Sequence, residues 1–517
     1  MKRYVIAAII LIFWAIPCFA GWQADLDELV KTGSVARRNK LIEKIADDAP
    51  GWQAVSNALR TIKFPDMPKW QIVEYTRTCI DLEDRPYIVY VPQSYDPAKP
   101  TPMFVYLHGG VSSDEIYGPR EEYVRNNRFT RMCEEHGWIG LFPFGQAGAT
   151  WWDDVGIENI LGQIREVKTR YNVDDDRIYM SGFSDGGSAS FLFAMILPTD
   201  FAAFIPLNGH MGVGSLDGDL PTYAPNFFNT PVYTVTTFND GLYPSKKMRE
   251  TIEMARNAGA DMLYRELAGV HRFDYGDSEI PLIADFLERH PRDPFPPRIV
   301  WETGHKKYGR CRWFEITDIA LEEPAKWHAD HNTTLISDRI TIGFISDENY
   351  QGDGVKVDNV LNNLSLAMRM DLRKDDIIIK ANDVDIHTLD DLGKFKSTIN
   401  RGDEVKIVVK RGNDRVALEG RLDEPKQYLI FKRTVPSAMA RVSYMANQVE
   451  LEASRVKSFK VYIHPAMFNM DENITIIVEG KTVFNKKLEP DIEYMLKDYI
   501  KNRDRKFIPV AEVKIDL

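Results

Sequence analysis

The sequence predicts an α/β domain, in which helices cover both faces of a mostly parallel sheet, followed by a β-rich region that holds a compact insert. Three observations predict this arrangement. Between residues 65 and 295, apolar strand-like runs alternate with amphipathic helical segments. Four prolines then fall within residues 290–297 and mark a domain boundary. Beyond that boundary the pattern is mostly that of strands, except in one compact segment.

Length and composition are those of a globular protein with several domains. The chain has 517 residues, which suits about two to four domains of roughly 100–200 residues each. Hydrophobic residues make up 44% and charged residues 27%, which is not a disordered composition. The formal net charge is −11 and the 65 Lys and Arg residues are scattered, whereas phosphate binding needs clustered positive charge. Nucleic acid is therefore not an expected partner.

The first twenty residues predict a secretory signal peptide over 1–20. Lys2 and Arg3 give a positive start, residues 5–14 are nearly all apolar, and Cys18-Phe19-Ala20 places small residues at −3 and −1 of a cleavage site. The protein is therefore predicted to be exported, as a periplasmic or secreted protein. Two alternatives stay open: lipidation at Cys18, and a membrane anchor, for which the run is short against roughly 20 residues. No later segment is apolar enough to span a bilayer.

Cysteine usage predicts no disulfide framework. Cys79, Cys133 and Cys311 follow the predicted signal peptide, and an odd count leaves at least one thiol unpaired. We predict no disulfide, no metal and no cofactor.

The predicted elements follow in chain order. Residues 21–64 predict one or two small helices, because apolar residues recur at spacings of three and four at positions 26, 29, 30, 41, 42 and 45. In the α/β domain, strands are expected at 71–76, 87–91, 103–107, 138–142, 177–181, 204–207, 231–236 and 262–266. Helices are expected at 158–171, from 186 onward, at 244–259 and at 281–290.

A candidate nucleophile lies between the strand at 177–181 and the helix that follows it. Gly182-Phe183-Ser184-Asp185-Gly186 matches the pattern G-x-S-x-G. The sharp turn from strand to helix crowds the backbone on both sides of the serine, so that Gly182 and Gly186 must lack side chains. The helix start stabilises negative charge that develops beside Ser184. The strand–turn–helix context makes this short motif specific.

The partners of Ser184 are expected in the order acid, then histidine. Asp240 directly follows a late apolar strand, and His271 lies on the loop after the next one, where the catalytic groups of an α/β sheet collect. His271 is predicted as the base that takes the serine proton, and Asp240 as the carboxylate that orients it. His210 as the base and Asp217 as the acid stay open as alternatives.

Further residues are predicted around the nucleophile. Backbone N–H groups of Asp185 and of Gly110 or Val111, in a His-Gly-Gly-Val stretch after the strand at 103–107, are the expected oxyanion donors. Trp151 and Trp152 are candidates to wall a substrate pocket, with ordinary packing as the alternative. His210 is also a pocket candidate.

With these residues in place, residues 65–295 resemble the secreted α/β-hydrolase esterases that include feruloyl and acetyl-xylan esterases and polyhydroxyalkanoate depolymerases. The matching pieces are 107–110, 171–187, 201–209 and the segments around Asp240 and His271. The resemblance implies the α/β-hydrolase fold and the Ser-His-Asp mechanism without defining the substrate. Prolyl-oligopeptidase-like peptidases share this framework, so peptide hydrolysis stays open.

Residues 336–428 resemble a bacterial-type PDZ domain, chiefly in the stretch 370–386. Asp371, Asp375 and Asp383 occupy positions that are usually glycine in that family, so these turns must be reached by Asp, which tolerates the left-handed conformation. The resemblance implies that an extended peptide adds beside a strand and that a loop captures its C-terminal carboxylate. The candidate loop is Ile342-Gly343-Phe344-Ile345. The alternative is that the domain binds no peptide and only shapes access to the active site.

Strand patterns flank this segment on both sides. Neither flank is long enough alone for a stable β domain, so we predict one β-sandwich-like domain built from 296–335 and 430–517, with the PDZ domain inserted in it. Residues 479–481 predict a hairpin turn inside the second flank.

Three functions are consistent with the sequence. The preferred one is an exported serine hydrolase that cleaves carboxylic esters through an acyl-enzyme, including acyl groups on a polysaccharide or another polymer. The second is a serine peptidase that uses the PDZ domain to present polypeptide. The third is a PDZ scaffold that carries a relic hydrolase, and the intact triad argues against it.

Overall fold

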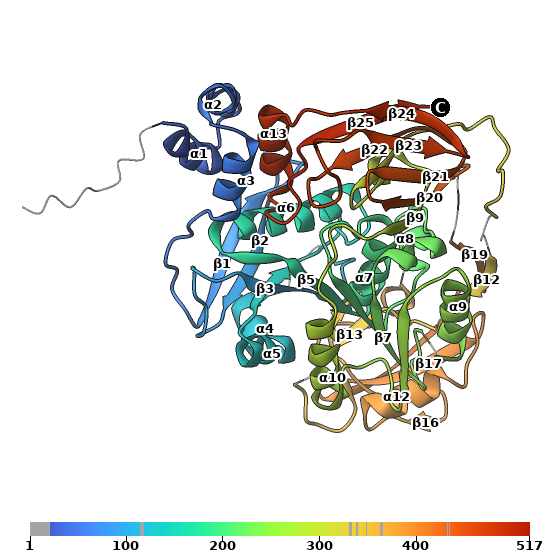
Figure 1. Cartoon of the computed structure of the whole chain (residues 1–517). Helices are drawn as coiled ribbons and strands as arrows, with labels where there is room; N and C mark the ends of the chain where they lie inside the picture. Colours follow the sequence, from blue (N-terminus) through green and yellow to red (C-terminus); the bar gives the residue numbers. More distant parts are fainter. Residues whose placement is uncertain are drawn as a thin grey trace, which may run out of the picture.

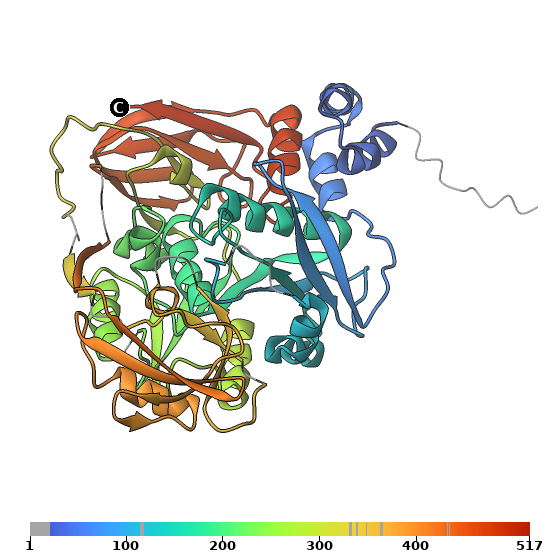
Figure 2. The same ribbon diagram turned by 180° about the vertical axis from the view of Figure 1, so that it is seen from behind.

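The structure is a computed structural model that describes residues 21–517 except 114–117, 244, 330–332, 338–339, 348, 362–364, 432 and 434. The predicted signal peptide lies outside the described residues. Figures 1 and 2 show a central α/β domain, a β unit packed with the N-terminal helices, and an insert on another side of the α/β domain.

The α/β domain is built on an eight-stranded sheet with the order β1-β2-β4-β3-β5-β6-β7-β8. Its strands are β1 (Gln71–Thr78), β2 (Asp84–Val91), β3 (Thr101–Leu107), β4 (Ile139–Pro143), β5 (Val173–Phe183), β6 (Ala203–Leu207), β7 (Val232–Thr237) and β8 (Met262–Leu267). Only β2 runs antiparallel to its neighbours, and the pairs from β4 to β8 are all parallel. The predicted mostly parallel sheet is confirmed.

Helices cover both faces of this sheet, as predicted. On one face, α6 (Asp154–Arg170), α7 (Asp185–Ile196) and α9 (Ser245–Asn257) bury their apolar residues in one core. On the other face, α4 (Arg120–Asn126), α5 (Arg128–His136) and α10 (Gly276–Arg289) form a second core. Two shorter helices, α8 (Val213–Leu216) and η1 (Ala224–Asn229), lie between β6 and β7.

The last helix of this domain starts earlier than predicted. The sequence pattern predicts a start at Pro281. In the structure α10 begins at Gly276 and contains Pro281. Pro281 is the sixth residue of α10, where its missing N–H removes one hydrogen bond to the preceding turn.

The β unit has two sheets, with the orders β10-β11-β22-β25 and β24-β23-β21-β20-β9. Its elements are β9 (Arg298–Thr303), η2 (Lys306–Tyr308), β10 (Arg310–Cys311), β11 (Phe314–Ile319), β20 (Ala438–Met445), β21 (Gln448–Ser454), β22 (Val456–Ile463), β23 (Ile474–Val478), β24 (Lys481–Lys486), α13 (Ile492–Asn502) and β25 (Ala511–Asp516). Glu479 and Gly480, both with positive φ, form the two-residue turn between β23 and β24.

The N-terminal helices belong to the core of the β unit. They are α1 (Trp22–Lys31), α2 (Val35–Asp48) and α3 (Trp52–Arg60). Leu29, Ile45 and Val55 are fully buried in the same apolar cluster as Trp301 and Phe459. Figure 1 shows these helices beside α13. The segment before the α/β domain therefore packs mainly with strands that lie more than two hundred residues later in the chain.

The insert begins and ends at one place, because β12 (Thr333–Ser337) pairs antiparallel with β19 (Lys426–Ile430). Between them lies a sheet of order β13-β14-β15-β17-β18, with β16 beside β15 and two helices. The elements are β13 (Phe344–Ser346), β14 (Val355–Val360), α11 (Leu366–Arg369), β15 (Ile377–Ala381), β16 (Val384–Asp385), α12 (Leu389–Lys396), β17 (Glu404–Arg411) and β18 (Asp414–Arg421). The PDZ assignment of this insert stays a prediction.

The turns of the insert use aspartate and asparagine in place of glycine. Asp371 and Asp375 have φ values of 63° and 68°, in the left-handed region. In the third predicted turn, Asn382 rather than Asp383 takes the positive φ, of 48°. Short polar side chains tolerate this conformation because they hydrogen-bond locally.

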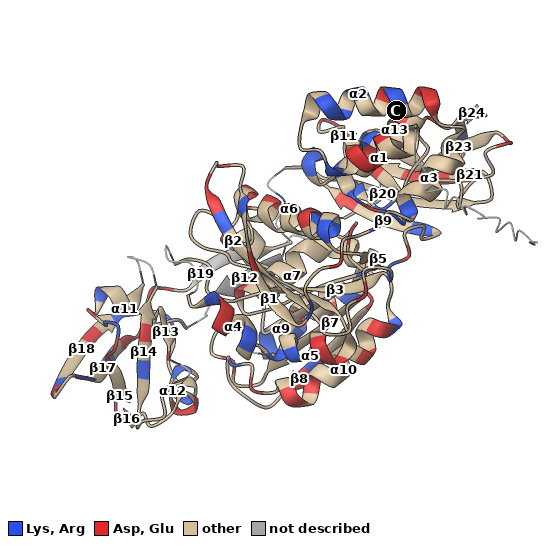
Figure 3. Cartoon of the chain, turned by 90° about the vertical axis from the view of Figure 1, so that its left-hand side faces the viewer, with Lys and Arg blue, Asp and Glu red and all other residues tan. Residues whose placement is uncertain are grey.

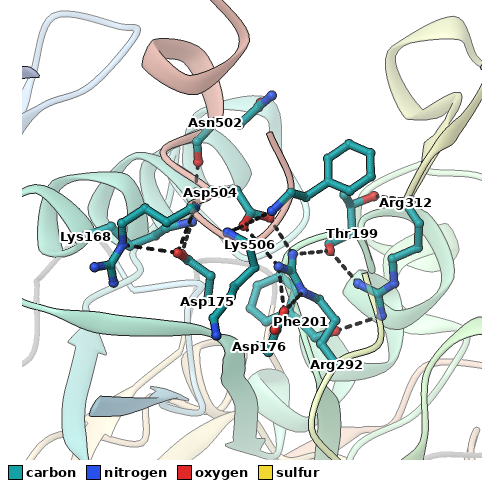
Figure 4. A network of polar contacts seen from close by, with 12 residues as sticks. Lys168, Asp175, Asp176, Thr199, Phe201, Arg292, Arg312, Asn502, Asp504 and Lys506 are labelled. Carbon is teal, nitrogen blue, oxygen red and sulfur yellow. Dashed lines mark hydrogen bonds and ion pairs between the residues drawn. The ribbon is translucent and has the colours of Figure 1, made fainter. Parts of the chain in front are cut away.

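Charges are mixed over all three parts, as Figure 3 shows for Lys and Arg against Asp and Glu. A buried cluster of charges joins the α/β domain to the β unit (Figure 4). Arg292 donates to Asp176 on β5 at 2.9 Å and to Asp504, which follows α13, at 2.7 Å. Lys168 on α6 pairs with Asp175 at 2.7 Å, and the backbone N–H of Arg505 donates to the same carboxylate.

Candidate active site

The candidate nucleophile lies on a strained turn between β5 and α7. Ser184 has φ 59° and ψ −115°, a conformation that is rare for residues other than glycine. A side chain on Gly182 would clash with the backbone of Gly186, and one on Gly186 would clash with the carbonyl oxygen of Leu107. These close approaches explain why both glycines flank the serine. The turn presents Ser184 at the carboxyl edge of the sheet.

Three side chains from separate loops form a hydrogen-bonded chain. The Oγ of Ser184 lies 2.8 Å from Nε2 of His271, and Nδ1 of His271 lies 2.8 Å from Oδ2 of Asp240. Because a carboxylate only accepts, Nδ1 carries the ring hydrogen and Nε2 is left to accept the hydrogen of the serine. The structure thus brings together the three residues predicted as catalytic.

Asp240 is buried and held by several donors. Its Oδ1 accepts from the backbone N–H groups of Leu242 and Tyr243, both at 2.8 Å, and its Oδ2 also accepts from the amide of Asn208 at 2.8 Å. Burial by itself raises the pKa of Asp240, but the charge and hydrogen bond of His271, with the other donors, outweigh it and leave that pKa lowered. The carboxylate therefore stays ionised where it supports the imidazole.

Three residues that sequence reasoning missed position the acid. The amide of Asn208 donates to Asp240 and to Oγ1 of Thr237, and its oxygen accepts from the hydroxyl of Tyr275 at 2.6 Å. Thr237 donates in turn to the carbonyl of Val270, the residue before His271. The signal was available for Asn208, which directly follows β6 at the same sheet edge as Asp240. Our sequence reasoning considered only His210 in that segment.

The loop after β3 is shaped by a buried histidine. His108 donates from Nδ1 to the carbonyl of Gly109 at 2.7 Å and accepts from the N–H of Gly145 at 3.0 Å. Burial lowers the pKa of His108 to about 4, so the ring is neutral. Gly110 follows with φ 67° and lies at the wall of the catalytic cavity.

One predicted oxyanion donor is not available in the structure. The N–H of Val111 donates to the carboxylate of Asp185 at 3.1 Å, and the Val111 side chain is fully buried. Val111 is therefore corrected from a candidate donor to a residue that anchors the loop. Gly110 lines the cavity, and the backbone N–H of Asp185 begins α7 directly after the nucleophile. These two stay candidates for the oxyanion hole.

The predicted pocket residues Trp151, Trp152 and His210 are also corrected, because none of them lines the catalytic cavity. Trp151 is fully buried and donates to the carbonyl of His108 at 2.9 Å. Trp152 packs within the core beside Gly218. His210 is buried and accepts from the N–H of Gly212 at 2.9 Å. Of the three, Trp151 holds the loop after β3 through its hydrogen bond to His108.

The catalytic cavity has a volume of about 830 Å³ and is walled by two domains. Ser184 and His271 come from the α/β domain, whereas Gly343, Phe344 and Ile345 of the insert line the opposite side. Ile345 comes close to Gly110, where an added methyl group would lie 3.5 Å from its Cδ1. Ile342, the remaining residue of the predicted peptide loop, is buried in the insert.

No cluster of three or more His, Cys, Asp or Glu side chains suited to a metal ion is found in the described part of the chain. Cys79, Cys133 and Cys311 are buried free thiols. No helix among the described residues has the length and apolarity to cross a membrane. Acyl transfer to Ser184 with His271 as base is the chemistry that these groups support.

The comparison with known sequences supports a relationship to esterases. No family model matches the chain. Over 155 residues the chain is 27% identical to the bifunctional acetylxylan esterase/xylanase XynS20E of Neocallimastix patriciarum. This similarity covers 29% of the chain and 21% of that protein, so that the chain spans about a fifth of the relative it matches.

The chain also matches parts of solved structures, among them esterases and a peptidase. A thermostable esterase is 23% identical over 43% of this chain and 63% of its own, with a TM-score of 0.34. A ferulic acid esterase is 16% identical over 42% and 97%, with a TM-score of 0.36. The acylaminoacyl peptidase of Pyrococcus horikoshii is 16% identical over 44% and 42%, with a TM-score of 0.35. Strand order and the nucleophile turn assign the domain to the α/β-hydrolase fold.

Proposed function

We propose that the protein is an exported serine hydrolase that cleaves carboxylic esters through an acyl-enzyme on Ser184. The observation that carries this proposal is the continuous hydrogen-bond chain from Ser184 through His271 to Asp240, with 2.8 Å at each step. Ser184 and His271 line a cavity of about 830 Å³, which is large enough for an ester and its leaving group.

The roles of the groups follow from their hydrogen bonds. His271 takes the proton of Ser184 on Nε2 as the serine oxygen attacks the ester carbonyl. The buried carboxylate of Asp240 stabilises the imidazolium that forms. The proton then passes to the leaving alcohol, and water attacks the acyl-enzyme in the same way. Backbone N–H groups of Asp185 and Gly110 are proposed to stabilise the oxyanion.

Acyl groups on a polysaccharide are the proposed natural class of ester. The support is the similarity to a protein whose name includes acetylxylan esterase, and that similarity covers 29% of this chain. The cavity is open between two domains, which suits a polymeric substrate.

Peptide hydrolysis is a second candidate, favoured by the position of β13. This strand is the end of the insert sheet, so one of its edges is unpaired in the described structure. Residues of β13 and α12 line the same cavity as Ser184. An extended peptide that adds to β13, by the mode that the PDZ resemblance implies, enters the catalytic cavity.

A substrate panel with the variant Ser184→Ala tests both candidates. The panel contains p-nitrophenyl acyl esters, acetylated and feruloylated xylan, and aminoacyl amides. We expect ester turnover to exceed amide turnover, and Ser184→Ala to lose at least about a thousandfold in kcat/KM. Ser397→Ala, which removes an exposed hydroxyl in the insert, is the matched control. Faster amide than ester turnover favours the peptidase, and activity retained in Ser184→Ala contradicts both candidates.

A further inference from the structure

Helix α12 of the insert packs directly against the two loops that carry the acid and the base. A methyl group on Gly393 would lie 2.8 Å from the side chain of Val270, the residue before His271. A methyl group on Gly241, the residue after Asp240, would lie 3.5 Å from Cβ and Cδ of Lys396. The stem of Lys396 therefore lies against the loop that carries Asp240, although this residue belongs to another domain.

Lys396 is part of the wall of the catalytic cavity. The side chain is partly buried, lines the cavity with Ser184, and places its nitrogen 5.8 Å from the centre of the Phe344 ring. Burial lowers the pKa of Lys396 to about 8, although the charge of Asp240 opposes this. Among the described residues no carboxylate forms an ion pair with it. Lys394, on the exposed side of the same helix, pairs with Asp390 at 3.3 Å.

Several carboxylates around the cavity are already engaged, whereas Glu122 and Asp274, which line it from the α/β domain, form no ion pair with Lys396 in the described structure. The two oxygens of Asp240 together accept hydrogen bonds from Asn208, His271 and the backbone of Leu242 and Tyr243. Asp347 and Asp358, which also line the cavity, pair with lysines of the insert. A partly desolvated cation beside apolar groups is stabilised by an anion that the substrate supplies.

We infer that Lys396 binds an anionic group of the substrate, so that the preferred esters carry a carboxylate beside the bond that Ser184 cleaves. This inference rests on the proposed function and specifies its substrate class. A carboxylate on a small ester and the C-terminal carboxylate of a peptide have the same chemistry at this site. Lys396 is thus a specificity-determining residue that the insert contributes to the active site.

Matched pairs of charged and neutral esters test the inference. In the first pair, 4-acetoxybenzoate carries a carboxylate on the alcohol part and 4-acetoxybenzamide is its neutral counterpart. In the second pair, 4-nitrophenyl hydrogen suberate carries a carboxylate on the acyl chain and 4-nitrophenyl octanoate is its neutral counterpart. We expect Lys396→Met, which keeps the apolar stem, to lower the charged-to-neutral ratio of kcat/KM about tenfold for at least one pair, mainly through KM. Lys396→Arg should restore most of the ratio. Lys394→Met is the control and should leave the ratio unchanged.

Calorimetric binding of 4-hydroxybenzoate and suberate to the full chain gives a readout that is independent of turnover. Weaker binding of either anion by Lys396→Met supports the inference even where Ser184→Ala shows that the proposed hydrolysis is wrong. A short peptide with a free or an amidated C-terminus, used as an inhibitor, distinguishes the source of the carboxylate. Unchanged ratios together with unchanged anion binding in Lys396→Met overturn the inference, including the case in which charged and neutral esters lose activity equally.

Discussion

The α/β domain meets its two neighbours in different ways. Its contact with the β unit is buried and charged. Arg292, whose side chain is 2% exposed, binds Asp176 and Asp504 (Figure 4). Arg312 donates to the carbonyls of Pro198 and Phe201. Its contact with the insert encloses the catalytic cavity, and the hydrogen bond from Asn359 to Ser113 is long, at 3.5 Å. The first contact holds two domains as one body, and the second leaves room for a substrate.

This difference explains where the two kinds of residue lie. Buried ion pairs demand exact geometry, because each charge loses its hydration and only its partner compensates. Such a network suits an interface that does not move. The insert touches the triad loops through small residues, Gly393 and Gly241, and through the stem of Lys396. An interface of this kind is able to adjust its spacing without breaking a buried ion pair.

The largest expected effect on stability comes from breaking the contact between the α/β domain and the β unit. Arg292→Ala leaves the carboxylates of Asp176 and Asp504 without their shared partner, and we expect a loss of about 3–5 kcal/mol in the free energy of unfolding. Denaturant unfolding followed by circular dichroism measures it. Arg289→Ala, which removes an exposed arginine paired with Asp285 at 2.6 Å, is the control and should have only a small effect. If Arg292→Ala loses no more free energy of unfolding than Arg289→Ala, the buried ion pairs do not hold the two domains together.

The second prediction concerns how the stability contributed by Asp504 changes at low pH. Burial alone raises the pKa of Asp504, but Arg292 and Lys168 outweigh it and leave that pKa below its usual range. A lowered folded-state pKa means that the carboxylate contributes stability above its unfolded pKa of about 3.9 and loses it as the pH falls. The stability difference between the wild type and Asp504→Asn should therefore shrink by about 1 kcal/mol between pH 5 and pH 3.

Unfolding curves of both proteins at several pH values measure this difference. Asp176 is common to the two proteins, but the charge of Asp504 contributes to its raised pKa, so that the titration of Asp176 opposes part of this change. A difference that is constant with pH, or that grows in acid, shows that Asp504 is not held ionised by Arg292.

The smallest effect on stability is expected at the contact between the α/β domain and the insert. Gly393→Val brings a side chain against Val270 and pushes α12 away from the loop of His271, so ester hydrolysis should fall about tenfold. The free energy of unfolding should change by only about 1 kcal/mol, because the insert is able to shift. Lys394→Val, at an exposed position of the same helix, controls for the substitution itself. If Gly393→Val is destabilised as much as Arg292→Ala, or keeps its full activity, the two contacts of the α/β domain do not differ in the way described.

The local features of the site were predictable from the sequence. The glycines around Ser184 follow from the crowding of a strand-to-helix turn, and the positions of Asp240 and His271 after late strands follow from the topology of a parallel sheet. The roles of Val111, Trp151 and Trp152 were not predictable in this way. Each depends on which buried acceptor or core its loop packs against, and a single sequence does not specify such contacts.

Asn208 was partly predictable from the sequence, whereas Lys396 was not. Asn208 directly follows a predicted strand, so its place at the active edge was within reach, but its hydrogen bonds to Asp240 and Tyr275 depend on side-chain orientation. Lys396 lies in a separate insert, more than one hundred residues after His271, and no local pattern connects the two.

The sequence by itself determined the alternation of strands and helices, the strained turn at Ser184 and the order of its partners, because these depend on side-chain periodicity and on short-range backbone sterics. Only the tertiary structure decided that the N-terminal helices share a core with the β unit, that Arg292 joins two domains, and that α12 closes over the triad. Those features are contacts between distant segments, which are set by the packing of whole surfaces and not by the pattern of either segment alone.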